Sequence, residues 1–339
     1  MSVNSIIILF VRPLFGRMID MKGRKRICLL GILCMIFCFP FFHLITDAGW
    51  FPIVLRALTG VGWGISMTAI ITMCSDLAPT ERLGHSMGII GIAGLVAQAL
   101  GPFIGEEIVS RFGFSGLFNS CIIFAVCAFF LILITPEVVP SENTKKSKFL
   151  DILGKISITS LIIICALPLI HGAERGSVIY FVSLFINVLH LGRVGPFFLA
   201  FSISAIFTRL AFGDLSDRYG RKILILPGGL LICLNLVLIS FINSHAMVII
   251  AGFVGGFGQG LLFPALSSYI IDVFGRENKG FAISLYLSLF DVGIGIGAPT
   301  FGWICDYFDY RTMFRIAAIP LFIALMIFTW KAPTPGRSG

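Results

Sequence analysis

Residues 12–25 read RPLFGRMIDMKGRK, and residues 209–222 read RLAFGDLSDRYGRK. Seven residues recur between the two stretches at one constant offset: Arg12, Phe15, Gly16, Asp20, Gly23, Arg24 and Lys25 return as Arg209, Phe212, Gly213, Asp217, Gly220, Arg221 and Lys222. Each copy is a basic turn that contains glycine and separates two long apolar stretches. A chain built from two similar membrane-embedded halves is typical of transporters.

The composition indicates a membrane protein. The 339 residues are 57% hydrophobic and 12% charged, whereas a soluble domain carries about 25% charged residues. Lipid offers the backbone no hydrogen-bond partners, so the chain crosses it as helices of about 20 apolar residues. Stretches of that size lie near 27–45, 50–75, 86–110, 115–135, 156–187, 196–212, 223–242, 246–271, 281–304 and 312–330, after a shorter one at 3–15. We therefore expect an all-α membrane protein of about 11 transmembrane helices.

Lysine and arginine divide unequally between the two sides of this arrangement. If the first basic turn is cytoplasmic, most of them lie in cytoplasmic segments, at 17–26, 82, 145–155, 218–222, 276–279 and 331–337. The opposite side holds only Arg111, Arg193, Arg311 and Arg315. The positive-inside rule then predicts a multi-pass plasma-membrane protein with a cytoplasmic C-terminus. Topology thus accounts for the net charge of +8, and no basic patch interleaved with aromatic residues indicates nucleic acid.

No residue pattern indicates an enzyme, a cofactor or a metal site. The nine cysteines form no Cys-x-x-Cys pair, and no His/Cys cluster has metal-ligand spacing. No Gly-x-x-x-x-Gly-Lys-Ser/Thr segment is present to bind ATP. The glycine-rich strings 60–64, 256–260 and 293–297 lie inside apolar stretches, which predicts close helix packing instead of dinucleotide binding.

The repeat also predicts the organisation of the chain. The polar segment 136–155 divides it into an N-terminal bundle, 1–135, and a C-terminal bundle, 156–332, related by an axis along the membrane normal. Gly213 lies 58 residues after residue 155, but only 15 residues precede Gly16. The first half is therefore expected to lack about 43 residues, equivalent to one helix and part of the next.

The repeated turn resembles a signature of the major facilitator superfamily. Gly16-x-x-x-Asp20-x-x-Gly23-Arg24-Lys25 resembles the family's motif in loop 2–3, and residues 213–222 resemble its echo in loop 8–9. The segment from Arg56 to Gly62 is similar to the motif of the fourth helix.

A second resemblance concerns the direction of transport. Gly88-x8-Ala97-x3-Gly101-Pro102-x-x-Gly105-Glu106 is similar to the motif of drug/proton antiporters, although Ala97 and Glu106 stand where the family usually has glycine. The resemblance covers the whole chain, as family helices 2 to 12. It implies a monomeric secondary transporter that exports small amphipathic compounds in exchange for protons. The alternatives are an uptake symporter for a metabolite, sugar or siderophore, and a truncated remnant that does not transport.

The repeated turn is expected to act as a cytoplasmic gate. Asp20 can face the positive N-terminus of another helix, Gly16 and Gly23 permit close approach and a tight turn, and Arg24 can pair with Asp76. The second gate is expected to contain Gly213, Asp217, Gly220, Arg221 and Asp272. The alternative is a solvated loop that only sets the topology.

Four of the charged residues inside the apolar stretches are candidate functional residues, because charge is costly at membrane depth. They are Arg56, Glu174, Arg175 and Asp291, and we expect them, with the polar Gln98, to face the central cavity. The resemblance implies a role in proton coupling for Arg56, whose alternative is snorkelling to the outer interface.

The two carboxylates have different surroundings in the sequence. Glu174 and Arg175 stand beside His171, Gly172 and Gly176, which predicts a distorted or broken helix lining a cavity; the alternative is an extracellular loop between two short spans. We interpret this pair as orienting the substrate, because Arg175 could hold Glu174 ionised. Asp291 has no cationic neighbour in sequence and is the predicted proton carrier, unless its role is a packing hydrogen bond.

Overall fold

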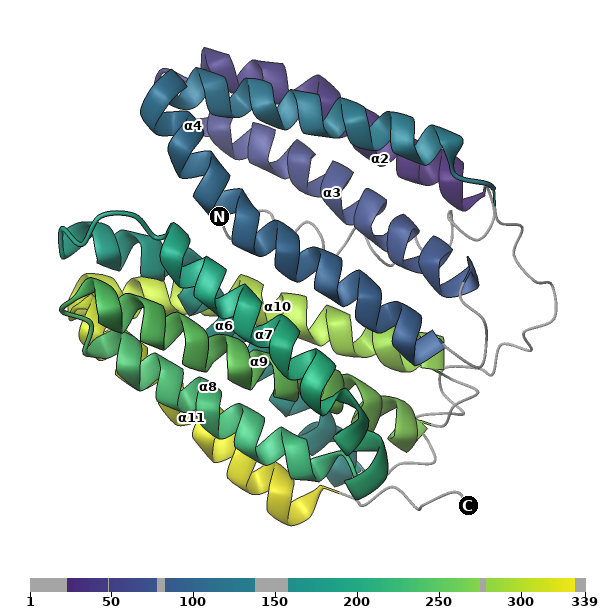
Figure 1. Ribbon diagram of the computed structural model, residues 1–339, viewed down its shortest axis with the longest axis vertical. Helices are drawn as coiled ribbons and strands as arrows, with labels where there is room; N and C mark the ends of the chain where they lie inside the picture. The colour runs from purple at the N-terminus through teal and green to yellow at the C-terminus, as the bar shows by residue number, and fades with distance from the viewer. Residues whose placement is uncertain (1–22, 48, 78–82, 138–157, 275–278, 333–339) are drawn as a thin grey trace. The chain divides into compact units, whose positions relative to one another are not determined.

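The protein is built from long α-helices (Figure 1). The computed structural model describes residues 23–47, 49–77, 83–137, 158–274 and 279–332, and no β-strand occurs in these ranges. The elements are α2 (Arg24–Cys38), the 3₁₀ helix η1 (Phe39–Leu44), α3 (Trp50–Leu77), α4 (Leu83–Ile134), α6 (Ile158–Val188), α7 (Gly195–Tyr219), α8 (Lys222–Ser240), α9 (His245–Phe274), α10 (Lys279–Tyr307) and α11 (Tyr310–Lys331). The prediction of an all-α membrane protein is confirmed.

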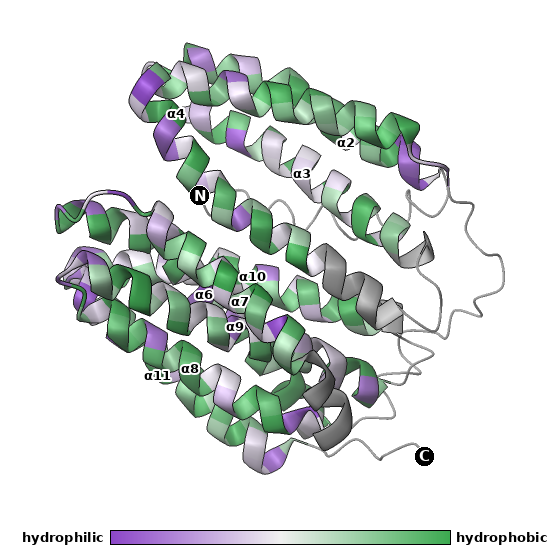
Figure 2. Cartoon of the chain, in the orientation of Figure 1, coloured by the Kyte–Doolittle hydropathy of each residue, from purple (hydrophilic) through white to green (hydrophobic). Residues whose placement is uncertain are grey.

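The predicted spans and the described helices agree closely. Within the described ranges, nine helical segments are long and apolar enough to cross a membrane, and they are hydrophobic over most of their length (Figure 2). The predicted spans 86–110 and 115–135 are joined in α4, where Gly113 turns the chain with φ 66° and ψ −173°. The short apolar stretch 3–15 lies outside the described residues.

Contacts group the chain into two compact units. One unit comprises Met1–Gly94 and Ile104–Thr144, and the other comprises Leu95–Phe103 and Lys145–Gly339. In the second unit, α6 packs against α10 and α11, α9 packs against α7 and α8, and α8 packs against α11. The second unit thus has a continuous helical core.

Helix α6 runs unbroken through Glu174 and Arg175. It spans 31 residues, Ile158–Val188, with Pro168 inside it. The expectation of a distorted or broken helix is therefore wrong, and so is the alternative of a loop between two short spans. The glycines that suggested a break serve a different purpose, because they allow the backbone of a neighbouring helix to approach.

Helices α6 and α10 meet along a seam of glycines. A Cβ atom at Gly172 would collide with the main chain of Phe290, and one at Gly293 would collide with the main chain of Leu169. Gly297 faces Ala173 in the same way. Small residues at this spacing let two helices pack backbone to backbone where lipid provides no hydrophobic drive. The predicted role of the 293–297 string in packing is confirmed.

The same packing device occurs at equivalent positions in the two units. In the first unit, Gly31 on α2 faces the carbonyl of Gly62 on α3, and in the second, Gly228 on α8 faces the carbonyl of Gly258 on α9. The sequence repeat is therefore a repeat of helix contacts within each unit.

Two hydrophobic clusters fill the second unit. One includes Ile163 and Leu167 of α6 with Tyr269, Tyr286 and Phe328. The other includes Val178, Val182 and Ile186 of α6 with Phe197 and Phe314. The α6 residues between these groups, from 171 to 177, include buried polar and charged side chains. A polar layer thus interrupts the core near the middle of the helix.

The last helix begins at a capping carboxylate. Asp309 accepts a hydrogen bond from the amide of Thr312 at 2.6 Å, which is the usual arrangement at a helix N-terminus. This hydrogen bond lowers the pKa of the Asp309 carboxyl. The start of α11 is therefore defined by a side chain outside the membrane-spanning segments.

The glycine seam predicts a selective loss of stability. Gly293→Ala places a methyl group against the main chain of α6, and overpacking of this kind costs about 1–3 kcal/mol. We expect a lower midpoint of thermal unfolding for the purified protein in detergent. Gly302→Ala on the same helix is the matched control, because its Cβ would meet only the ring of Phe181 at 3.4 Å. Equal losses in both variants would contradict the seam.

Candidate functional site

An ion pair joins the second copy of the repeated turn to α9. Nε of Arg221 donates a hydrogen bond to Oδ2 of Asp272 at 2.9 Å, and both side chains are mostly shielded from solvent. The repeat predicted this contact. It ties the turn between α7 and α8 to the end of α9, so movement of either element would break a charged hydrogen bond.

Glycine shapes the turn in both copies. Gly23 has φ 90° immediately before α2, and Gly220 has φ 100° between α7 and α8. Residues with a side chain rarely adopt this left-handed region. The expected tight turn is therefore present at equivalent positions.

The lysine of each copy binds the end of a distant helix. Nζ of Lys25 donates to the carbonyl oxygens of Leu133 and Thr135 at 2.7 and 2.8 Å, and Nζ of Lys222 donates to that of Ala332 at 2.6 Å. Helix C-termini expose unpaired carbonyls and attract cations. This role was not predicted from the sequence, although both lysines belong to the repeated motif.

Most of the other predicted gate residues lie in parts of the chain that the structure does not describe. Gly16 and Asp20 lie outside the described residues, as do the side chains of Asp76 and Asp217. Gly88 and Gly213 fall in helical segments whose side chains the structure does not describe. Arg24 is buried at the start of α2. The gate roles predicted for these residues remain predictions.

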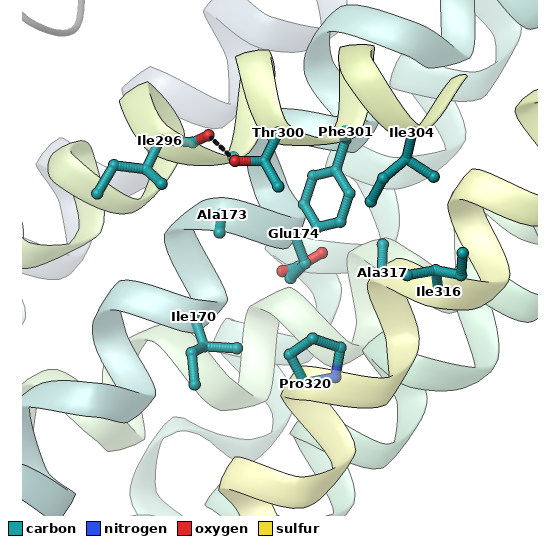
Figure 3. Close-up of a pocket in the computed structure, with 11 residues that line it drawn as sticks. Ile170, Ala173, Glu174, Ile296, Thr300, Phe301, Ile304, Ile316, Ala317 and Pro320 are labelled. Atoms are coloured by element: carbon teal, nitrogen blue, oxygen red, sulfur yellow. Dashed lines mark hydrogen bonds between the residues drawn. The ribbon is translucent and has the colours of Figure 1, made fainter. Parts of the chain in front are cut away.

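A cavity inside the second unit has Glu174 in its wall. The cavity measures about 230 Å³ and lies between α6, α10 and α11. Figure 3 shows the Glu174 carboxylate directed between Phe301 of α10 and Ala317 and Pro320 of α11. The other lining residues are mostly apolar: Ile170, Ala173, Ile296, Gly297, Thr300, Ile304 and Ile316. A buried carboxylate therefore adjoins a largely apolar space within one unit.

His171 is the immediate partner of Glu174. Its Nδ1 lies 2.9 Å from Oε1 of Glu174, one helical turn away, and both side chains are almost fully buried. The His171 ring also contacts Phe290 of α10, with ring centroids 5.1 Å apart. A contact between His171 and Glu174 was not predicted, although their spacing of three residues places the two side chains on the same face of a helix.

Arg175 points away from the cavity. Its guanidinium carbon lies 4.2 Å from the ring centroid of Phe201 on α7, and Arg175 is not among the residues that line the cavity. Within the described part of the chain, it forms no ion pair with Glu174. The interpretation of the two charges as one substrate-orienting pair therefore lacks the expected contact.

The other predicted residues occupy separate places. Asp291 is half-buried on α10, two residues before the glycine seam. Arg56 is exposed on α3, with its guanidinium 5.7 Å from the ring of Phe42, and Gln98 is half-buried on α4. Gly101, Pro102 and Gly105 also belong to α4.

Comparison with known proteins decides the family. The sequence model of the Major Facilitator Superfamily matches residues 1–207 and 194–339, which together cover the chain. The chain belongs to the major facilitator superfamily. This membership identifies it as a membrane transporter that moves small molecules through a bundle of transmembrane helices.

Several members of the superfamily are similar over nearly the whole chain. An uncharacterised MFS-type transporter, YhhS, of Salmonella paratyphi C is 25% identical over 97% of this chain and 82% of its own length. The multidrug resistance protein MdtG of Salmonella heidelberg is 22% identical, covering 98% and 83%. A homologue of the multidrug efflux pump PmrA from Lactococcus lactis is 24% identical, covering 94% and 80%.

A solved structure shares the superfamily fold. The human organic anion transporter MFSD10 matches with a TM-score of 0.74, over 96% of this chain and 82% of that one. The two sequences are 17% identical, so this likeness establishes the fold alone.

The Arg221–Asp272 pair predicts measurable coupling. Arg221→Gln and Asp272→Asn should each lower the free energy of unfolding in mixed micelles, because each removes a charged hydrogen bond from a site that is mostly shielded from solvent. The double variant should be more stable than the sum of the two losses implies, with a coupling energy of about 0.5–3 kcal/mol. Asp306→Asn, at an exposed position of α10, is the control. Strict additivity of the two single losses would show that the contact has no energetic role.

Proposed function

We propose that this transporter exports small amphipathic compounds across the plasma membrane in exchange for protons. The single observation that carries the direction of transport is the similarity, over almost the whole chain, to proteins named for multidrug resistance and efflux. The antiporter-like motif at Gly88, Gly101, Pro102 and Gly105 supports the same direction. The substrate would cross by alternating access between two bundles, with 136–155 as the cytoplasmic linker.

The repeated turn would control access from the cytoplasm. The hydrogen bond from Arg221 to Asp272 fixes the turn between α7 and α8 against the end of α9 within the second unit, so the turn would move with its bundle. In the first half, Asp20, Arg24 and Asp76 would form the equivalent gate. Making and breaking contacts between such a turn and the other bundle would give the transporter two discrete states, as alternating access requires.

Proton coupling needs a titratable group at membrane depth. Glu174 and Asp291 lie well inside described spans of the second unit, whereas Asp272 and Asp306 lie at span ends. Protonation of an inner carboxylate would remove the charge that makes its burial costly. Arg56 and Gln98 are proposed to contribute to the substrate path. The proposed unit of function is a monomer with its C-terminus in the cytoplasm.

Dye transport in inverted membrane vesicles tests the direction and the coupling. Vesicles that contain the chain and respire should accumulate ethidium, a lipophilic cation, and nigericin should stop the accumulation by collapsing the pH gradient. Asp272→Asn should slow ethidium accumulation by about tenfold, because a gate that does not close dissipates the pH gradient that drives accumulation. Asp306→Asn should transport at the wild-type rate.

Two other results would replace the proposal. Gradient-driven uptake of a sugar or other metabolite in right-side-out vesicles, without dye export, would identify a symporter. An absence of movement of dyes and metabolites in both vesicle orientations would identify a chain that does not transport.

A further inference from the structure

We propose that His171 and Glu174 form a proton-sharing pair, which binds and releases the coupling proton inside the second unit. This inference rests on the proposed proton coupling. It assigns the carrier to Glu174 together with a histidine instead of to Asp291. The observations that carry it are the burial of both groups, their distance and the cavity beside the carboxylate.

Both members of the pair are buried, and three of their polar atoms make no hydrogen bond to other residues in the described part of the chain. His171 is 0% exposed and Glu174 is 2% exposed. Nδ1 and Oε1 lie 2.9 Å apart, and within the described residues neither these atoms nor Nε2 of His171 makes a further hydrogen bond. Buried polar atoms are usually satisfied, and exceptions often mark a functional site. Each group is therefore the available partner for the other's proton.

Few titratable or charged groups surround the pair, so we expect it to gain or lose a single proton. The residues of α10 and α11 that face Glu174 across the cavity carry no titratable group: Ile296, Gly297, Thr300, Phe301 and Ile304 on α10, and Ile316, Ala317 and Pro320 on α11. On α8, Cys233 lies within electrostatic range of Glu174, and its thiol donates to the carbonyl of Ala318. On α6 itself, Arg175 is the neighbouring cation.

We assign two protonation states to the His171–Glu174 pair. In the unloaded state, Glu174 is ionised, His171 is neutral, and Arg175 balances the carboxylate charge at a distance. In the loaded state, the added proton lies on the Glu174 carboxyl group, which keeps its contact with Nδ1 of His171, so the pair itself is neutral. Two interacting groups that share one proton titrate as a unit.

The cavity gives the carboxyl group room to move. Ile170, Ala173 and Phe301 leave about 230 Å³ open beside it, so a change of its side-chain torsions can carry it away from His171. Helices α10 and α11 form the other walls, and a shift of either helix would change how readily the proton leaves. Proton binding and helix position are thereby linked through one side chain.

Infrared difference spectroscopy during a pH titration tests the pair without requiring transport. The purified full chain in lipid nanodiscs should show a protonated carboxyl C=O band that disappears as the pH rises. Labelling glutamate with ¹³C should shift this band, and labelling aspartate should not. Glu174→Gln should remove the band, and Asp291→Asn should keep it.

The role of His171 is tested by the pH midpoint of the carboxyl band. His171→Asn should change the proton affinity reported by the band by about tenfold, because the partner that shares the proton is gone. An unchanged midpoint would overturn the pair, as would a band that follows the aspartate label or that is lost in Asp291→Asn. The labelling result comes from the wild-type chain, so it stands even where a variant fails to fold. Failure of ethidium export with an intact glutamate band would reject the proposed function and retain the pair.

Discussion

The close approach of α6 and α10 is the constraint on which the rest of the second unit depends. Gly172 and Gly293 bring main chain against main chain, so the two helices cannot rotate about their axes without a collision. The rotation of α6 then determines where its polar residues point. Glu174 faces the crevice between α10 and α11, and Arg175 faces α7. A packing requirement in a lipid environment thereby decides which charge adjoins the cavity.

The two copies of the repeated sequence make the same kinds of contact in the two halves of the chain. Lys25 and Lys222 each bind the C-terminal carbonyls of the last described helix of their own half. The glycine pairs Gly31–Gly62 and Gly228–Gly258 each bring two helices together. The repeat thus preserves contacts as well as residue types, which explains why the spacing of the motif is retained while most other positions differ.

Much of this arrangement could be predicted from the sequence, and the limits are physical. Span length follows from the thickness of the bilayer, so the helices were predictable to within a few residues. The Arg221–Asp272 contact was predictable because the repeat supplied the partner. The direction of the Glu174 side chain could not be predicted. Adjacent residues on a helix point about 100° apart, and the rotation of α6 is set by its glycine contacts with α10. The break expected at Gly172 and Gly176 was wrong because glycines in a membrane helix serve packing as readily as bending.

Proton movement coupled to substrate movement is the most direct test of this account. The purified chain would be reconstituted into liposomes with a pH-sensitive dye inside, and an ethidium gradient would be imposed across the bilayer. The account predicts that protons cross in the direction opposite to ethidium and that reversing the ethidium gradient reverses the sign of the pH change. Ethidium flux without any pH change, or with protons moving in the same direction, would contradict it.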